Sequence, residues 1–493
     1  MNAHVQTPRR NHPLARLTRV VEDTIPDPLL ALPPLLLALG LLALAPARMA
    51  SDTWFGLAAG RDIAHAGLPH SDRLTAFTAG QPWQDQQWLA HLASYGLFDL
   101  GGLPLVYLAD VACLVGALCI AMLAARSLGG SPVWIAAVAT PLILIQVPSA
   151  ARAQTFAMPL FAALVWVLAR DARSPDRRIL LVIPLLALWA NVHGSVVLGC
   201  ALVVLRCAVG AAAALRGHGR RDLARYAAIA FAAFLAPLAS PYGFDLLDYY
   251  RATMTNDALR SIVSEWGATT LRGWFGPLFF AFAAVAIAAI LRPEVRLGLF
   301  DSLCLALLVL VGLDALRNVV WLPYAAVVLL PAGLAAWSPE SPARSRLRPL
   351  LVWSAVAVAL AAGMLAGRVS SPALEEPWPD AQGAAIARAA AHDPSLRVIA
   401  AVAYSDWLLW RFPELRGRVA YDIRFELLGP RGLEDVAALE DGAGDARDGR
   451  FAGYRLSLWN RDSNPGIVRS LLAQPGARVL STDGTVYAFL RPA

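Results

Sequence analysis

Residues 28–54 read PLLALPPLLLALGLLALAPARMASDTW, an apolar run that passes directly into Asp52 and Trp54. A bilayer core of about 30 Å is crossed by about 20 apolar residues in a helix, so residues 28–47 can span it. Arginines precede the run, and arginine is retained on the cytoplasmic side. The Ala45–Ala47 segment also resembles a signal-peptide cleavage site, but the length of the run favours an uncleaved anchor. We therefore expect Asp52 just beyond the outer face of the membrane.

The composition indicates a membrane protein. Of the 493 residues, 57% are hydrophobic and 16% are charged, whereas soluble proteins carry about 25% charged residues. The net charge is +6, and the basic residues stand in short clusters between apolar runs, which is typical of cytoplasmic loops rather than of a nucleic-acid-binding stripe. The five cysteines lie in apolar runs and lack the spacing of a disulfide framework or a zinc site. We predict no nucleic-acid partner.

Apolar runs of near-spanning length recur along the chain and predict a mainly α, polytopic bundle of about eleven transmembrane helices. The predicted spans are 28–47, 102–124, 131–147, 154–170, 179–191, 195–215, 224–239, 275–291, 299–313, 318–337 and 349–367.

Arginine density alternates between successive connections and orients the spans. Arg170, Arg173, Arg177 and Arg178 crowd one connection, for example, whereas the next, WANVHG (189–194), has none. By the positive-inside rule the N-terminal segment 1–27 is cytoplasmic, residues 28–367 form the membrane domain, and residues 368–493 are extracytoplasmic. We expect a multi-pass protein of the bacterial inner membrane.

Two long outer loops and the C-terminal segment complete the predicted architecture. Loop 48–101 contains a segment (88–102) with the spacing of an interfacial helix, and loop 240–274 is polar enough to cap the bundle. In the C-terminal segment a helix is predicted at 380–391, strands are predicted at 397–402, 417–423, 477–482 and 485–491, and a Gly/Asp-rich loop at 441–450. This pattern predicts a small α/β domain.

Two acids of the first outer loop are candidate catalytic groups. Asp52 lies a few residues beyond a span, which gives a general base or a ligand of a divalent cation a stable mount. The ordinary alternative is a solvated carboxylate at the start of a helix. Asp85, between Trp83 and Trp88, is the second acid. The neighbouring histidine His91 has no metal-binding spacing and is predicted to lie at the membrane interface.

Polar residues at the outer ends of other spans are candidate substrate ligands. Arg152, His193 and Arg317 stand at three such ends, and arginine suits the phosphate of an anionic lipid because its fork matches phosphate oxygens. Each alone is equally consistent with a snorkelling side chain. Asn191 and the Glu265–Trp266 pair could orient a sugar or close a turn.

Two charged residues lie within predicted spans, Asp110 and Arg206. Charges in lipid are costly and usually paired, so a structural ion pair between them is one interpretation. A proton or ion path is the other.

Together these motifs resemble the GT-C superfamily of polytopic glycosyltransferases, which use polyprenyl-phosphate-linked sugars. The chain is also similar to a group of bacterial integral-membrane proteins in its signatures, which are Asp52-x-Trp54, GLPHSD (67–72), Trp83 with Trp88-Leu89, Arg152-x-Gln154, WANVHG, SPYG with Tyr242, Glu265–Trp266, and, more loosely, SDWLLWRFP and YDIRFE in the tail. The resemblance implies Asp52 as the base, Arg152 and Arg317 as ligands of the leaving phosphate, and Gln154 and Tyr242 as further substrate ligands.

The resemblance has departures that bear on cofactors. The paired acids of some GT-C enzymes are absent at 52–54, and position 87 is Gln where Glu is expected. No cofactor is therefore assigned, and Mg²⁺ or Mn²⁺ stays open.

The leading interpretation is an inverting membrane glycosyltransferase that transfers a sugar from a polyprenyl-phosphate donor to a lipid, glycan or protein acceptor on the outer side. The alternatives are a flippase for a lipid-linked glycan, which predicts functional residues in mid-membrane and an internal repeat, and a non-catalytic envelope assembly protein.

Overall fold

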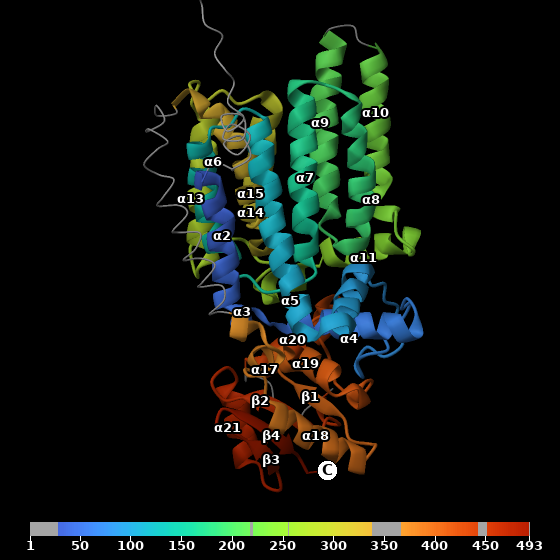
Figure 1. Ribbon diagram of the computed structural model, residues 1–493. Coiled ribbons are helices and arrows are strands. Elements are labelled where there is room, and N and C mark those ends of the chain that lie inside the picture. The colour runs from blue at the N-terminus through green and yellow to red at the C-terminus, as the bar shows by residue number, and fades with distance from the viewer. Residues whose placement is uncertain (1–27, 217–219, 255, 338–365, 442–450, 493) are drawn as a thin grey trace, which may run out of the picture.

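The computed structural model describes residues 28–216, 220–254, 256–337, 366–441 and 451–492. Long helices stand side by side in one half of the molecule, and an α/β domain formed by the C-terminal residues occupies the other (Figure 1). The prediction of a mainly α bundle with a small C-terminal α/β domain is confirmed.

The bundle helices coincide with ten of the eleven predicted spans; most of the eleventh, 349–367, lies outside the described residues. The helices are α2 (Pro28–Ala43), α5 (Trp88–Ser127), α6 (Pro132–Gln146), α7 (Gln154–Arg173), α8 (Val182–Val192), α9 (Val196–Arg216), α10 (Arg220–Leu235), α13 (Phe275–Leu291), α14 (Leu299–Asp314) and α15 (Trp321–Gly333). Four segments in the described part are long and apolar enough to cross a membrane, or five if the bent α10–α11 pair is one span.

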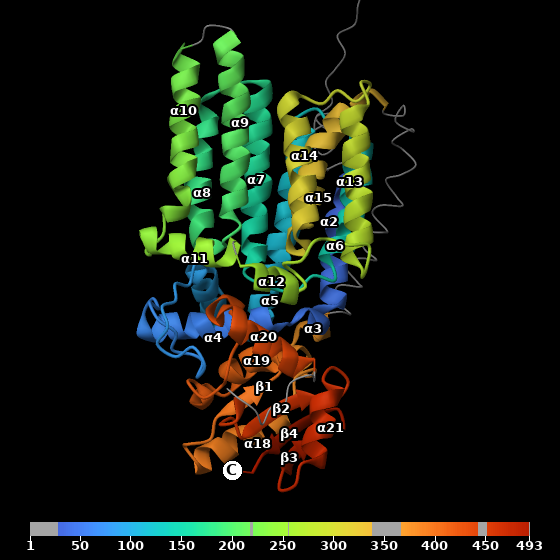
Figure 2. The ribbon, with the colours of Figure 1, turned by 180° about the vertical axis from the view of Figure 1, so that it is seen from behind.

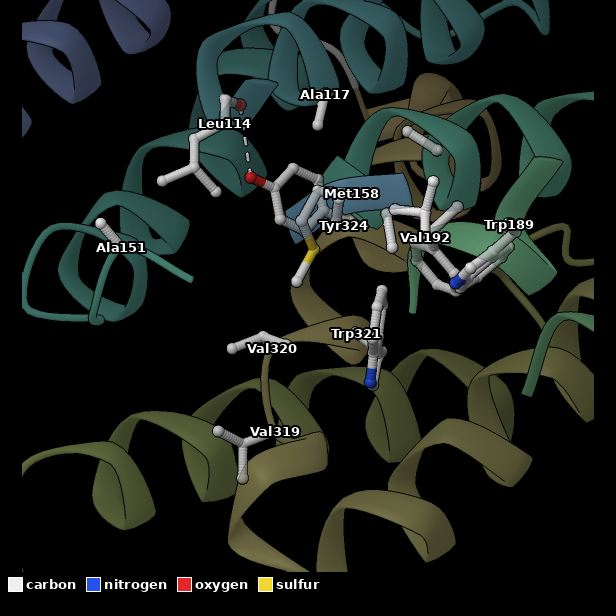
Figure 3. Close-up of a cluster of buried hydrophobic side chains, with 14 of the residues drawn as sticks. Leu114, Ala117, Ala151, Met158, Trp189, Val192, Val319, Val320, Trp321 and Tyr324 are labelled. Carbon is white, nitrogen blue, oxygen red and sulfur yellow. Dashed lines mark hydrogen bonds between the residues drawn. The ribbon is translucent and has the colours of Figure 1, made fainter. Parts of the chain in front are cut away.

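Aromatic side chains fill the centre of the bundle, where α15 is almost entirely buried. Trp321 lies 5.0 Å from Phe161 and 5.8 Å from Trp189 between ring centroids. The Tyr324 hydroxyl donates to the Leu114 carbonyl at 3.4 Å, which links α15 to α5 (Figure 3). Because lipid is as apolar as these side chains, close packing and such hydrogen bonds, rather than exclusion from water, hold the helices together.

A layer of short elements covers the end of the bundle that faces the C-terminal domain (Figure 2). It contains α3 (Ala45–Arg48), α4 (Ser51–Ala66), α11 (Leu246–Met254) and α12 (Asp257–Ile262). The predicted interfacial helix is the first part of α5, separated from the rest by non-helical Gly101 and Gly102. Gly102 has φ +68°, a conformation that glycine adopts without steric cost.

The C-terminal domain is built on a four-stranded sheet in the order β1-β2-β4-β3, with β1 and β2 parallel and the other pairs antiparallel. Its elements are α17 (Ser371–Glu375), α18 (Asp380–His392), β1 (Val398–Ala400), α19 (Val402–Arg411), α20 (Gly429–Glu440), β2 (Leu456–Asn460), α21 (Pro465–Ala473), β3 (Arg478–Thr482) and β4 (Val486–Leu490).

One predicted strand, 417–423, is wrong, and one strand, β2, was not predicted. Residues 417–423 make only an isolated bridge, Val398 to Val419, because their backbone turns away to pair with the outer loop. The amides of Ala76 and Phe77 donate to the carbonyls of Val419 and Ala420 at 2.7 and 3.0 Å. The strand β2 was not predicted; it is buried on both faces, so it lacks the alternation that marks half-exposed strands. Most of the predicted loop 441–450 lies outside the described residues.

An ion cluster, which we call the Arg424 clasp, joins the outer loop to the C-terminal domain. Arg424 donates to Asp422 at 2.6 Å and to Asp72 at 2.7 Å, and all three side chains are buried. Asp72 also accepts from Thr75 and Thr78 at 2.5 and 2.6 Å. The cluster fixes residues 423–426 over the end of the bundle.

Candidate active site

A cavity of about 180 Å³ lies between the end of the bundle and the C-terminal domain. Its walls come from the start of α4 and of α7, from the loops before α9 and α15, and from residues 423–426. Eight of the ten predicted site residues line it, namely Asp52, Asp85, Arg152, Gln154, His193, Glu265, Trp266 and Arg317.

Asp52 occupies the first turn of α4. The Thr53 hydroxyl donates to the Ala151 carbonyl at 2.5 Å, which fastens this turn to the loop that carries Arg152. Burial raises the pKa of Asp52, and Glu265 adds to the rise, while Arg152 and Arg317 oppose it. The carboxylate is therefore a stronger base than an exposed aspartate, since a raised pKa favours proton uptake.

Arg152 and Glu265 form an ion pair at the edge of the cavity. Nη1 of Arg152 donates to both carboxylate oxygens, at 2.9 and 3.1 Å. Burial would raise the pKa of Glu265, but the charge and hydrogen bonds of Arg152 together with the charge of Arg317 outweigh it, so the pKa is lowered. The side chains are 15% and 48% exposed, which leaves the pair open to the cavity.

Arg317 is positioned by the loop that carries Glu265. Its backbone amide donates to the Glu265 carbonyl at 3.0 Å, and its guanidinium lies 4.1 Å from the centroid of the Trp266 ring. The cation and ring attract one another, so Trp266 holds Arg317 at the cavity wall. Two guanidinium groups, from loops far apart in the sequence, thus face one space.

His193 is a neutral hydrogen-bond donor in this cavity. Burial lowers its pKa well below the usual value, and Arg317 and Arg152 lower it further. The Ser195 amide donates to Nδ1 at 3.1 Å, so the ring proton resides on Nε2. Position 193 therefore offers an N–H without adding charge.

Asp85 lines the cavity and is paired with a histidine. His91 Nδ1 lies 2.7 Å from Oδ2 of Asp85, and both side chains are about 3–4% exposed. The His91 ring packs against Gly56 of α4, where a Cβ would come within 3.3 Å of it. This pair braces α4 against α5.

Two predicted substrate ligands lie outside the cavity lining. Asn191 accepts from Trp88 at 2.8 Å and donates to the carbonyls of Ala187 and Ala239 at 2.8 and 2.6 Å, so its amide is used to join helix ends. Tyr242 is 4% exposed and its ring packs edge-on against His70. In this structure both residues hold the scaffold together.

The sequence did not identify the contribution of the C-terminal domain. Phe425 and Glu426 line the cavity from the side opposite the bundle. Burial raises the pKa of Glu426 to about 7. The segment YDIRFE (421–426) stood out among the motifs, but no role followed from it, because the docking of the domain is not encoded in local pattern.

The described residues contain no group of three or more His, Cys, Asp or Glu side chains that could hold a metal ion. A complete Mg²⁺ or Mn²⁺ site is therefore not supplied by these side chains.

Asp110 and Arg206, two charged residues within predicted spans, do not pair with each other. Asp110 bonds to Arg48 at 2.7 Å, and Arg206 bonds to Asp171 at 2.7 Å. The proposed Asp110–Arg206 pair is wrong, because the two residues belong to helices whose nearer charges satisfy them.

No protein-family model matches the chain, and no curated protein matches it in sequence. Among solved structures, arabinofuranosyltransferase AftD from Mycobacteria superposes with a TM-score of 0.51 and its R1389S mutant with 0.55, each at 16% identity. These matches cover 95% of this chain, which spans only 40–42% of AftD. Apo ArnT from Cupriavidus metallidurans superposes at 0.50 and 15% identity over 96% of this chain and 98% of ArnT. The chain therefore shares the fold of AftD and ArnT over most of its length.

Proposed function

We propose that this protein is a membrane glycosyltransferase that moves a sugar from a polyprenyl-phosphate-linked donor to a hydroxyl of a lipid, glycan or protein acceptor. The observation that carries the proposal is that Asp52, Arg152 and Arg317 line one cavity at the end of the bundle. A base and two phosphate-binding cations in one space are what transfer from a lipid phosphate requires. The likeness in fold to the arabinofuranosyltransferase AftD supports this class of reaction.

In the proposed reaction Asp52 accepts the proton of the acceptor hydroxyl. The acceptor oxygen forms a bond to the anomeric carbon as the bond from that carbon to the phosphate oxygen breaks. The electron pair of this bond leaves with the polyprenyl phosphate, and the configuration inverts. Arg152 and Arg317 bind the phosphate whose charge grows as the bond breaks.

The other cavity residues have supporting roles in this proposal. His193 Nε2–H and the Gln154 amide donate to substrate oxygens, and Glu265 holds Arg152 until the phosphate arrives. Asp85, held by His91, is the second acid and orients the acceptor. A divalent cation, Mg²⁺ or Mn²⁺, would need oxygens of the donor phosphate to complete its ligands, since the described side chains do not.

We place the reaction on the extracytoplasmic side of a bacterial inner membrane. This follows from the arginine clusters, which crowd the connections at the end of the bundle remote from the cavity. The flippase alternative predicts functional charges in mid-membrane, but Asp110 and Arg206 each have an ion-pair partner. A non-catalytic assembly protein would not need the cations to share a cavity with Asp52.

The test is transfer by the purified protein. Wild type and Asp52→Asn, reconstituted in lipid, are supplied with a panel of polyprenyl-phospho-sugars and an envelope lipid extract, and release of polyprenyl phosphate is measured. We expect a loss of about 10²–10⁴-fold in Asp52→Asn, the range for removal of a general base. Asp99→Asn, an exposed acid of the same region, is the control and should be fully active. Equal rates in Asp52→Asn and wild type would contradict the role of Asp52.

A further inference from the structure

A second, larger cavity of about 600 Å³ lies at the other end of the bundle. It is bounded by the end of α7, the facing parts of α9 and α10, and the start of α14. Helices α9 and α10 project beyond α7 and α14 at this end, remote from the C-terminal domain (Figure 2). The cavity is therefore backed by a helical hairpin and is distinct from the proposed active site.

Arginines dominate its walls, and we call it the basic pocket. The four lining arginines are Arg173, Arg206, Arg225 and Arg296. Carboxylates meet three of them: Asp301 lies 2.8 Å from Arg173, Asp171 lies 2.7 Å from Arg206, and Asp222 lies 3.9 Å from Arg225. The side chain of Arg296 is exposed and has no ion pair with a described residue, so the pocket keeps an excess of positive charge.

Donors inside the basic pocket remain without acceptors. Arg206 is only 3% exposed, yet its Nε has no hydrogen-bond partner among the described residues, and Nε of Arg225 has none either. Leaving a buried donor unpaired is costly, so both groups are able to donate to a bound anion. The first turn of α14 also contributes to the wall, with Gly298, Leu299 and Asp301. The Asp301 carboxylate accepts from the Gly298 amide and pairs with Arg173, so this helix start already has its own counter-charge.

The other side chains that line the basic pocket are mostly small or apolar. Gly210, Ala213 and Ala214 of α9 leave the room that larger side chains would fill. At Gly210 a Cβ would meet the Tyr226 ring at 2.5 Å and Arg206 Nη1 at 2.9 Å, so glycine permits this close packing. In the pocket wall, Leu299 is 58% exposed. An occupant with an anionic head and apolar chains fits both surfaces.

We propose that the basic pocket binds the phosphodiester headgroup of an anionic phospholipid in the leaflet remote from the C-terminal domain. The arginines receive the phosphate, and the acyl chains lie against exposed Leu299. The cytoplasmic leaflet carries the anionic lipids that basic pockets between helix ends recognise. This proposal does not depend on the sugar-transfer chemistry, because no residue of the pocket lines the first cavity.

The test is lipid retention by the intact protein. Protein purified in neutral detergent and stripped of lipid is titrated with phosphatidylglycerol, cardiolipin or phosphatidylcholine, and bound lipid is counted by native mass spectrometry. We expect the anionic lipids to bind more tightly than phosphatidylcholine. Arg296→Gln should weaken them by about fivefold, and Arg225→Gln should do so by a similar factor.

Arg292→Gln is the matched control, because it removes the same charge from the same end of the bundle without touching the lining. Retention unchanged in Arg296→Gln, or weakened equally in Arg292→Gln, would overturn the proposal. So would equal binding of phosphatidylcholine. A further titration uses inorganic phosphate alone: if millimolar phosphate displaces the lipid completely, the pocket is a free-phosphate site and the lipid assignment fails. If Arg225→Gln does not fold, the result for Arg296→Gln still decides the question, because the Arg296 side chain is exposed.

Discussion

Two arginine–carboxylate pairs flank Asp52, and they differ in exposure. Arg48–Asp110 is sealed, with side chains 1% and 7% exposed, whereas Arg152–Glu265 is open, at 15% and 48%. A small cavity of about 30 Å³ behind Asp52 is lined by both Asp110 and Arg152, so the pairs are neighbours. The two pairs therefore differ in what they can do. The buried Arg48–Asp110 pair cannot exchange partners with a substrate, but the partly exposed Arg152–Glu265 pair can.

The sealed pair should give the largest effect when broken. Arg48 also donates to the Ser149 carbonyl at 2.7 Å and to the Tyr107 hydroxyl at 3.0 Å. Arg48→Gln leaves Asp110 buried without its cation, and we expect a loss of about 3–5 kcal/mol in stability. Thermal unfolding in detergent measures this. The double variant Arg48→Met with Asp110→Leu should recover much of the loss, since it leaves no buried charge; a double variant as unstable as the single one would contradict the argument.

Breaking the exposed Arg152–Glu265 pair should lower the catalytic rate and leave the stability of the fold nearly unchanged. Arg152→Gln removes a proposed ligand of the leaving phosphate, and we expect kcat/KM to fall by about 100-fold, or roughly 2.7 kcal/mol. Its unfolding midpoint should stay near that of wild type, because the pair is partly exposed. Arg272→Gln, an exposed arginine outside the cavity, is the control. If Arg152→Gln unfolds as readily as Arg48→Gln, the distinction between the pairs fails.

The pH dependence sharpens the comparison further. Burial raises the pKa of Asp52, so the acidic limb of the kcat/KM profile should lie above the pH at which an exposed aspartate titrates. The base works when deprotonated, and activity is therefore lost as the pH falls through this raised pKa. Arg152 opposes the rise, so Arg152→Gln should move the limb to still higher pH. A limb that moves to lower pH in that variant would exclude Asp52 as the titrating group.

The smallest effect is expected at the exposed partner. Glu265 competes with the donor phosphate for Arg152, so Glu265→Gln should lower the donor KM by up to about fivefold, the upper value for a partly exposed pair. Steady-state kinetics with a fixed acceptor concentration gives this value. The variant Glu265→Asp, which keeps the charge, serves as the comparison. A donor KM that rises would instead show that Glu265 contacts the donor itself.

The bundle and one half of the site follow from the sequence for a simple physical reason. Hydropathy and arginine content predict where a span ends, and residues at the arginine-poor ends of spans are expected to share one level in the membrane. Asp52, Arg152, His193 and Arg317 therefore meet without any knowledge of helix packing. The eight predicted residues in the cavity all belong to this level.

The remaining features depend on tertiary choices that local pattern does not contain. Which arginine meets Asp110 depends on the packing of α3 against α5, so Arg48 could not be chosen over Arg206. Asn191 and Tyr242 lie outside the cavity lining, and their position could not be predicted because joining helix ends and binding sugars use the same polar side chains. Glu426 was missed because its position depends on how the C-terminal domain docks.

The Arg424 clasp has a consequence for how the protein can be dissected. Truncating the chain after the bundle would remove Arg424. Asp72, in the loop between α4 and α5, would then be exposed to water without its counter-charge. The truncation would also remove one wall of the candidate active-site cavity, since residues 423–426 line the cavity and are held by the same cluster. The bundle side and the C-terminal domain therefore share one buried ion cluster. Replacing either with a homologous module would require the residues on both sides of this cluster to be changed together.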